Sequence, residues 1–150
     1  MTTPTPVPSG KPTPAAFCTT HGFPDLTRWV TLEDEVTSRS VRNALHDKLI
    51  GYGEYVEHLI YPEGLTDGWE SSVFSEAEHE HLATFHRHIA LLDKECALLD
   101  VEGSMDDELV MIKRLVVEWP KLVSEMKRII TKSRDAYGKQ AIHGPASYLG

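Results

Sequence analysis

The stretch SEAEHEHLATFHRHIALLDKECALLD, residues 75–100, carries the clearest helix signal in the chain. Ser75 is a good N-cap residue, and Glu78 completes the Ser-x-x-Glu capping box that satisfies the first backbone N–H groups of a helix. Apolar side chains then recur every three or four residues, which is the period of an α-helix. They are Leu82, Phe85, Ile89, Leu92, Cys96 and Leu99. The stretch therefore predicts an amphipathic helix from Ser75 to Asp100.

A first helix is predicted before this stretch, over residues 31–61. Thr31 and Asp34 have the spacing of a capping pair. The apolar positions keep the helical period through Gly51 and Gly53, although each glycine costs about 1 kcal/mol relative to alanine. These positions are Val41, Leu45, Leu49, Tyr52, Val56, Leu59 and Ile60. We therefore expect one unbroken helix, followed by a loop over residues 62–72.

A third helix is predicted after the turn VEGS, residues 101–104, where Ser104 and Asp107 repeat the capping pattern. Its apolar stripe keeps its phase across Pro120, so a kink is expected there and not a division of the helix. The stripe consists of Leu109, Ile112, Val116, Trp119, Val123, Met126 and Ile130. Gly138 is expected to end the helix.

Three long helices joined by short loops predict an all-α fold, an antiparallel bundle over residues 30–137. The alternative has four helices, with the first or third helix divided. Residues 1–29 are expected to form a disordered Pro-rich head and an irregular lead-in, because the segment up to residue 16 is rich in proline and poor in apolar bulk. Residues 138–150 are expected to be a tail.

The composition of the 150 residues is that of one soluble globular domain. A formal charge of −8 argues against binding to nucleic acid or to anionic membranes. No apolar run has the length of a membrane span, and no secretory signal is recognisable, so a cytoplasmic protein is expected. The charge is uneven: residues 63–108 hold thirteen acids against only Arg87 and Lys94, whereas residues 121–139 are basic.

Four histidines lie in the predicted second helix as two pairs seven residues apart. At about 100° per residue, His81 and His88 fall on one flank of the apolar stripe, and His79 and His86 fall on the other. None of them has a histidine four residues away, which is the spacing for chelation by a single helix. A metal ion would therefore need ligands from a second helix.

The first helix offers such ligands if the helices are antiparallel. Glu57, near its end, is expected at the height of Glu78 and His81, near the start of the second helix. These three residues form the candidate metal site, with His46 and His88 as possible additions. Imidazole and carboxylate ligands suit iron or zinc.

Two motifs in this region resemble those of a known family. EYVEHLIYPEGL, residues 54–65, is similar to the helix ending His-x-x-x-Glu-Glu-x-x-Leu-Phe-Pro of hemerythrin-like proteins. AEHEHLATFHRHIALLD, residues 77–93, resembles the Glu-His-x-x-Leu helix that follows it in that family. The resemblance covers about residues 41–92 and implies a helical bundle with a non-haem di-iron centre, used for oxygen binding, iron handling or sensing. It implies that Glu57 is the bridging carboxylate and His81 a ligand.

Gly53 and Phe85 stand where the family has ligands, so two functional classes remain open. The first is a divergent hemerythrin-like protein that binds iron or another transition metal through glutamate and histidine. The second is a metal-free helical interaction or structural module, which presents an acidic helix face and a basic third helix to a protein partner. No Gly-rich phosphate loop or Gly-x-Ser-x-Gly motif indicates an enzyme.

Overall fold

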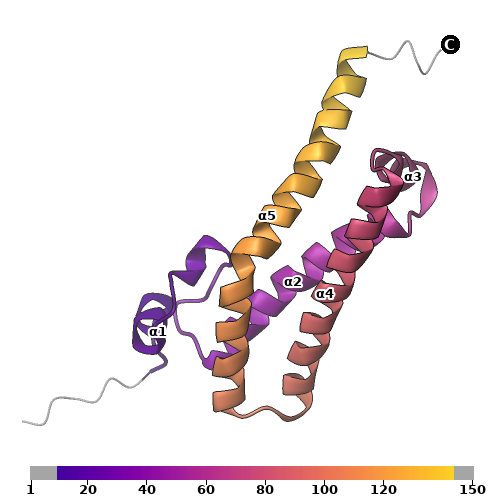
Figure 1. The fold of residues 1–150 in the computed structure, drawn as a ribbon. Helices are drawn as coiled ribbons and strands as arrows, with labels where there is room; N and C mark the ends of the chain where they lie inside the picture. The colour runs from indigo at the N-terminus through magenta and orange to yellow at the C-terminus, as the bar shows by residue number, and fades with distance from the viewer. Residues whose placement is uncertain (1–9, 144–150) are drawn as a thin grey trace, which may run out of the picture.

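The structure is a computed structural model that describes residues 10–143, with side chains up to residue 140. Within these residues all regular structure is helical, which confirms the all-α fold class (Figure 1). The elements are α1 (Pro14–His21), the 3-10 helix η1 (Leu26–Arg28), α2 (Ser38–Ile60), α3 (Gly64–Ser72), α4 (Glu76–Glu102) and α5 (Met105–His143).

Helix α4 begins where the capping box predicts. The Glu78 N–H donates to Ser75 Oγ at 3.2 Å, and the Ser75 N–H donates to the Glu78 carboxylate at 3.5 Å. The predicted stripe from Leu82 to Cys96 is buried, and the helix runs two residues beyond Asp100. Local capping and periodicity together were therefore sufficient to define this helix.

Helix α2 begins later than predicted, and the capping role assigned to Thr31 is wrong. Thr37 is the N-cap, and it exchanges two hydrogen bonds with Ser40. Residues 31–37 are not helical. They form an irregular segment that places Val36 in the core, and the Val36 N–H donates to the Pro12 carbonyl at 2.9 Å. Burial of Val36 thus prevails over the local capping signal at Thr31.

The two glycines of α2 lie inside one continuous helix, as predicted. A Cβ added to Gly53 would lie 3.2 Å from Ile89 Cγ2 on α4, whereas one added to Gly51 would meet nothing within 4 Å. Gly53 therefore allows α2 and α4 to approach closely, which offsets its low helix propensity.

Residues 62–72 are not the loop that was predicted, because most of them form α3. Gly64 has a φ of 82°, a left-handed conformation that suits glycine and turns the chain after Pro62. Ser71 then donates to the Leu59 carbonyl at 2.7 Å, and the ring of Trp69 lies 4.5 Å from that of Tyr137 on α5. Tertiary contacts hold this short helix, so local sequence alone did not reveal it.

The N-terminal lead-in also contains a helix that was not predicted. Thr13 caps α1, and Gly22, with a φ of 69°, ends it. The helix forms because it buries Phe17 against the core, together with Leu26 from η1. Residues 1–9 of the expected disordered head lie outside the described residues.

Helix α5 is continuous through Pro120 and bends near its middle, as a proline inside a helix predicts (Figure 1). Gly138 does not end it, contrary to prediction, since the helix continues to His143. Its buried stripe is also rotated relative to the predicted one, because apolar residues cover more than one face. The residues that point inward are Met111, Ile112, Leu115, Trp119, Leu122, Met126 and Ile129.

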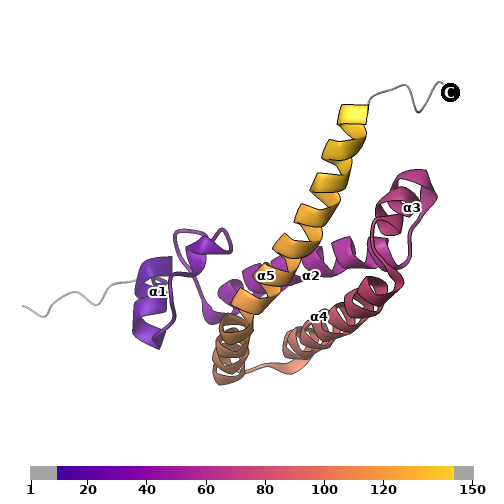
Figure 2. The same cartoon turned by 45° about the horizontal axis from the view of Figure 1, so that its top comes forward.

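Helices α4 and α5 form a hairpin whose arms diverge from the turn at Gly103 and Ser104 (Figures 1 and 2). Both arms pack chiefly against α2 and much less against each other. The core therefore lies where α2 meets each arm, and it contains Leu45, Leu49, Leu82, Leu92, Ile112, Leu115 and Trp119.

Candidate functional site

The two flanks predicted for α4 face different neighbours. His81 and His88 point to α5, where their Nε2 atoms lie 2.9 Å from Glu125 and 2.6 Å from Glu118. On the other flank, His79 Nε2 lies 2.8 Å from the Ser71 carbonyl of α3. The predicted pairing of His81 with His88, and the separation of both from His79, are therefore confirmed.

The same geometry separates the residues of the candidate metal site. Glu78 and His81 lie on the flank that faces α5. Glu57 is exposed and lines a groove on the other flank, together with His86 and Asp93. Matching heights along antiparallel helices did not bring these side chains together, because the rotation of each helix sends them to opposite sides.

The two additional candidates are also engaged elsewhere. His46 is buried on α2 and its Nε2 lies 2.6 Å from Asp93, whereas His88 pairs with Glu118. Among the side chains that the structure describes, no group of three histidine, cysteine, aspartate or glutamate residues is arranged to hold a metal ion. The geometry gives no support to the predicted ligand set.

Four polar pairs connect the arms of the hairpin, and we call them the α4–α5 ladder. They run antiparallel along the seam: Glu78 with Lys132, His81 with Glu125, His88 with Glu118, and Glu95 with Arg114. Long polar side chains thus span the space between the two arms. His81 and His88, which first suggested a metal site, instead pair with glutamates of α5.

Two carboxylates of the ladder, Glu78 and Glu125, are stabilised in their charged form. Lys132 Nζ lies 2.5 Å from both oxygens of Glu78, and this contact lowers the pKa of Glu78. Burial of Glu125 by itself raises its pKa, but hydrogen bonds from His81 and Arg128 outweigh this and lower the pKa overall. Both glutamates therefore remain ionised in the folded protein at a pH where the unfolded chain binds protons.

The lowered pKa of Glu78 predicts a loss of stability in acid. A carboxyl group with a depressed folded-state pKa stabilises the protein above its unfolded pKa, and this contribution disappears as the pH falls through the folded value. We expect Glu78→Gln to flatten the fall in the free energy of unfolding between about pH 5 and pH 3. Urea denaturation across that range measures it. Glu80→Gln, an exposed substitution two residues away, should follow the wild-type curve. If Glu78→Gln follows the wild-type curve as well, the contact with Lys132 does not stabilise the protein in this way.

The solvent-facing side of the hairpin carries an apolar surface that sequence reasoning missed. Leu91 and Leu98 of α4 are 52% and 67% exposed, and Val110 and Val117 of α5 are each 70% exposed. Each pair is spaced by seven residues, so its members share one direction. We call these four residues the outer strip. A groove lies at the Leu98 and Val110 end of the strip, where its lining also includes Leu99, Met111 and the charged residues Glu95, Asp107 and Arg114.

Four exposed basic residues border the outer strip, and we call them the basic rim. On α4 they are Arg87 and Lys94, which are the only bases in the acidic segment 63–108. On α5 they are Lys113 and Lys121. Each lies three or four residues from Leu91 or Val117, which places it on the same helix face.

The basic rim is available to an acidic partner. Lys94 Nζ is 3.7 Å from its neighbour Asp93, and within the described part of the chain Lys113 and Lys121 form no ion pair. The acids Glu102 and Asp106 lie next to the turn, at the far end of this face. The basic rim therefore places positive charge beside Leu91 and Val117 on a chain whose formal charge is −8.

A buried ion cluster lies beneath the turn. Arg42 of α2 has no exposed surface, and its Nε lies 2.6 Å from Oε2 of Glu108, which is only 3% exposed. Its Nη2 lies 2.5 Å from Asp100 Oδ1. The hydrogen bond with Glu108, and then that with Asp100, raise the pKa of Arg42. The hydrogen bond from Arg42 lowers the pKa of Asp100. The cluster ties α2 to both arms at the point where they join.

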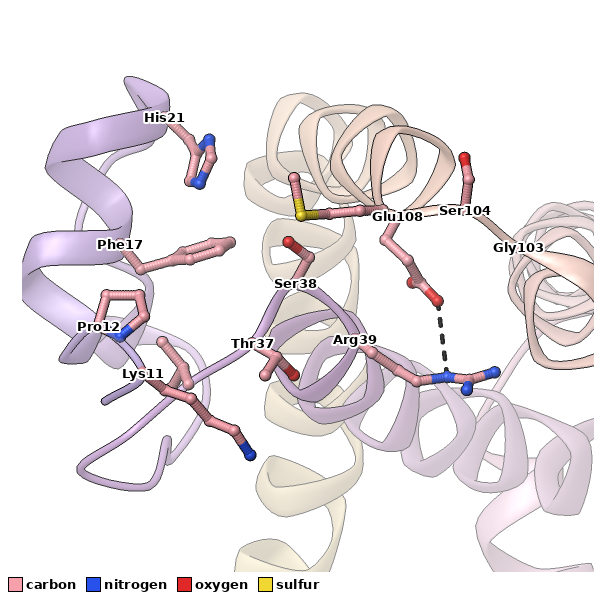
Figure 3. Close-up of a pocket in the computed structure, with 12 residues that line it drawn as sticks. Lys11, Pro12, Phe17, His21, Thr37, Ser38, Arg39, Gly103, Ser104 and Glu108 are labelled. Carbon is pink, nitrogen blue, oxygen red and sulfur yellow. Dashed lines mark ion pairs between the residues drawn. The ribbon is translucent and has the colours of Figure 1, made fainter. Parts of the chain in front are cut away.

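A cavity opens beside this cluster, between α1, the start of α2 and the turn (Figure 3). Phe17, Pro12 and His21 form the wall on the α1 side, and Ser104 and Glu108 lie opposite. Arg39 lies on the Glu108 side, with its Nε 3.8 Å from Glu108. The sequence did not predict this cavity, because its walls come from three separate segments.

The fold and these surfaces define an all-helical protein with an uncovered apolar face on a two-helix hairpin. Comparisons of the chain with family models, with curated proteins and with solved structures gave no match. The resemblance to hemerythrin-like proteins therefore stays a prediction. Within residues 10–143, no helix combines the length and apolar content needed to cross a membrane.

Proposed function

We propose that the protein is a helical interaction module that binds an acidic amphipathic helix of a partner protein along the outer strip. The helices α2, α4 and α5 act in this proposal as an antiparallel scaffold that holds the strip rigid. The observation that carries it is an exposed apolar strip bordered by bases on an otherwise acidic chain.

The apolar part of the proposal rests on the alignment of the exposed residues. Single exposed leucines and valines are ordinary on protein surfaces, but contiguous apolar patches mark interaction sites. Leu91 and Val117 lie beside the pair of His88 and Glu118, which joins α4 to α5. Leu98 and Val110 line one groove. A partner helix with apolar residues at matching intervals fits such a groove.

The charged part rests on the basic rim. An acidic partner is repelled by the net charge of the chain, so local attraction to the rim determines where it docks and in which register. Exposed charges of this kind act mainly on the association rate and are screened by salt. Binding should therefore weaken as the ionic strength rises.

The alternative class, a hemerythrin-like metal protein, has less support. Glu78, His81, His46 and His88 each take a partner within the helical framework, and Glu57 lies apart from them. Metal analysis of protein purified without chelators distinguishes the two classes. A stoichiometric transition metal that is lost in His81→Ala would favour the metal class.

Two designed peptides test the proposal. Each is a helix of about 21 residues with leucine at heptad positions, flanked by glutamate in one peptide and by lysine in the other. We expect the glutamate peptide to bind at least about tenfold more tightly, which is about 1.4 kcal/mol. Fluorescence anisotropy at low and high salt measures both affinities. The double variant Lys94→Glu with Lys113→Glu should reverse the preference.

Matched substitutions locate the site. Leu98→Asp should abolish binding of the glutamate peptide, whereas Leu65→Asp should not, since Leu65 is 94% exposed on α3. Equal affinity for both peptides, or equal loss from both substitutions, would overturn the proposal. If the chain forms dimers that Leu98→Asp dissociates, the occupant of the strip is a second copy and not a partner helix.

A further inference from the structure

We propose that the cavity beside α1 binds a small amphipathic anion, an aliphatic or aromatic carboxylate whose apolar body enters the cavity. This site is separate from the outer strip and does not depend on the proposed interaction with a partner helix. Three properties of the cavity carry the inference: its size, its apolar walls and the balance of charge around it.

The size and walls suit a small molecule. The cavity has a volume of about 510 Å³, within the range of roughly 300–1,000 Å³ that is usual for ligand sites. The apolar lining consists of the buried residues Phe17 and Val36 together with Pro12 and Met105. An apolar ligand body would cover these walls and exclude water from them.

The charge balance favours an anion. The lining includes two cations, Lys11 and Arg39, and one carboxylate, Glu108. Arg42 engages both oxygens of Glu108, at 2.6 and 3.1 Å, and also pairs with Asp100, so Arg42 and Arg39 together balance these two carboxylates and Lys11 remains unbalanced. The charge left at the cavity is therefore positive.

Neither of the two cations is held by a short contact. Lys11 is exposed and forms no ion pair with any described residue. Arg39 makes long contacts, 3.8 Å to Glu108, 3.4 Å to the Asp100 carbonyl and 3.5 Å to the Leu99 carbonyl. The nearby acid Asp107 is turned away to cap α5, where it accepts the Ser104 N–H at 3.1 Å. A carboxylate that enters the cavity would gain charge-assisted hydrogen bonds from Lys11 or from Arg39, which lie on its two sides (Figure 3).

The methionine methyl groups provide a local readout. Met105 lines the cavity, whereas Met126 is buried in the core of α5 and serves as an internal reference. In protein labelled with ¹³C at the methionine methyl groups, decanoate or 2-naphthoate should shift the Met105 signal in a saturable manner and leave Met126 unchanged. Decanol, which lacks the charge, should bind at least about tenfold more weakly.

Charge reversal at the cavity separates this site from the rest of the surface. Lys11→Glu and Arg39→Glu should each weaken decanoate binding about tenfold and leave decanol binding unchanged. Lys113→Glu, on the basic rim, should have no effect. Lys11→Glu remains informative if Arg39→Glu fails to fold, because Lys11 lies on an exposed segment before α1.

Three results would overturn the proposal. Equal affinity for decanoate and decanol would remove the role of the anion. A stationary Met105 signal with both carboxylates would remove the site. A loss of decanoate binding in Lys113→Glu as large as that in Lys11→Glu would place the ligand on the outer strip.

Discussion

Arg42→Met is expected to lower the free energy of unfolding by about 3–5 kcal/mol, because it leaves the carboxylate of Glu108 buried without its partner. Glu108 is 3% exposed and receives both of its close ionic contacts from Arg42. Removing one member of a buried pair leaves an uncompensated charge, which costs far more than the pair itself contributes. Urea denaturation followed by circular dichroism measures the loss.

The double variant Arg42→Met with Glu108→Leu distinguishes this cause from lost packing. Replacement of both charges by apolar side chains removes the buried charge, so the double variant should be more stable than Arg42→Met alone. Arg39→Met is the control, since Arg39 is largely exposed and a surface ion pair contributes only about 0–1 kcal/mol. If the two single effects of Arg42→Met and Glu108→Leu simply add, the pair is not coupled and the explanation is wrong.

Trp119→Ala is expected to destabilise the protein by a similar amount, about 3–5 kcal/mol. Trp119 has no exposed surface, and its ring lies 6.0 Å from Trp29 and 5.9 Å from Tyr52. It therefore joins α5 to α2 and to the lead-in at a single point. Truncation would leave a cavity that these aromatic rings cannot fill, and near-ultraviolet circular dichroism should lose intensity together with stability.

Trp69→Ala is the matched control for that change. Trp69 is only partly buried, on α3, where it packs against Tyr137 near the outer end of α5. Its loss should cost clearly less than the loss of Trp119. If the two substitutions destabilise the protein equally, the packing around Trp119 does not hold the core together as described.

The predictability of each helix depended on whether its signals were local. For α4, the cap at Ser75 and an uninterrupted stripe were sufficient, because both act within a few residues. For α2, the pattern at Thr31 predicted a cap, but Thr37 is the N-cap because Val36 is buried, which a local pattern does not contain. Helix α3 was missed for the same reason, since its contacts are with α2 and α5.

The candidate sites show the same limit. The flanks of α4 follow from rotation per residue along one helix, so the separation of His81 from His79 was predictable. The proposed meeting of Glu57 with Glu78 needed the relative rotation of two helices, which sequence spacing does not specify. The outer strip was hidden because Val110 lies next to the buried pair Met111 and Ile112, so α5 shows no single apolar face in sequence.

The divergence of α4 from α5 has a consequence for how the protein can evolve. The arms contact each other mainly through the polar ladder, whereas both pack against α2. The distance between the arms therefore depends on the α2 side chains against which each arm packs. A change of volume at a core position of α2, such as Leu45 or Leu49, would therefore widen or narrow the hairpin without altering any residue on its surface. The shape of the surface that a partner would bind thus depends on core residues that the partner does not contact.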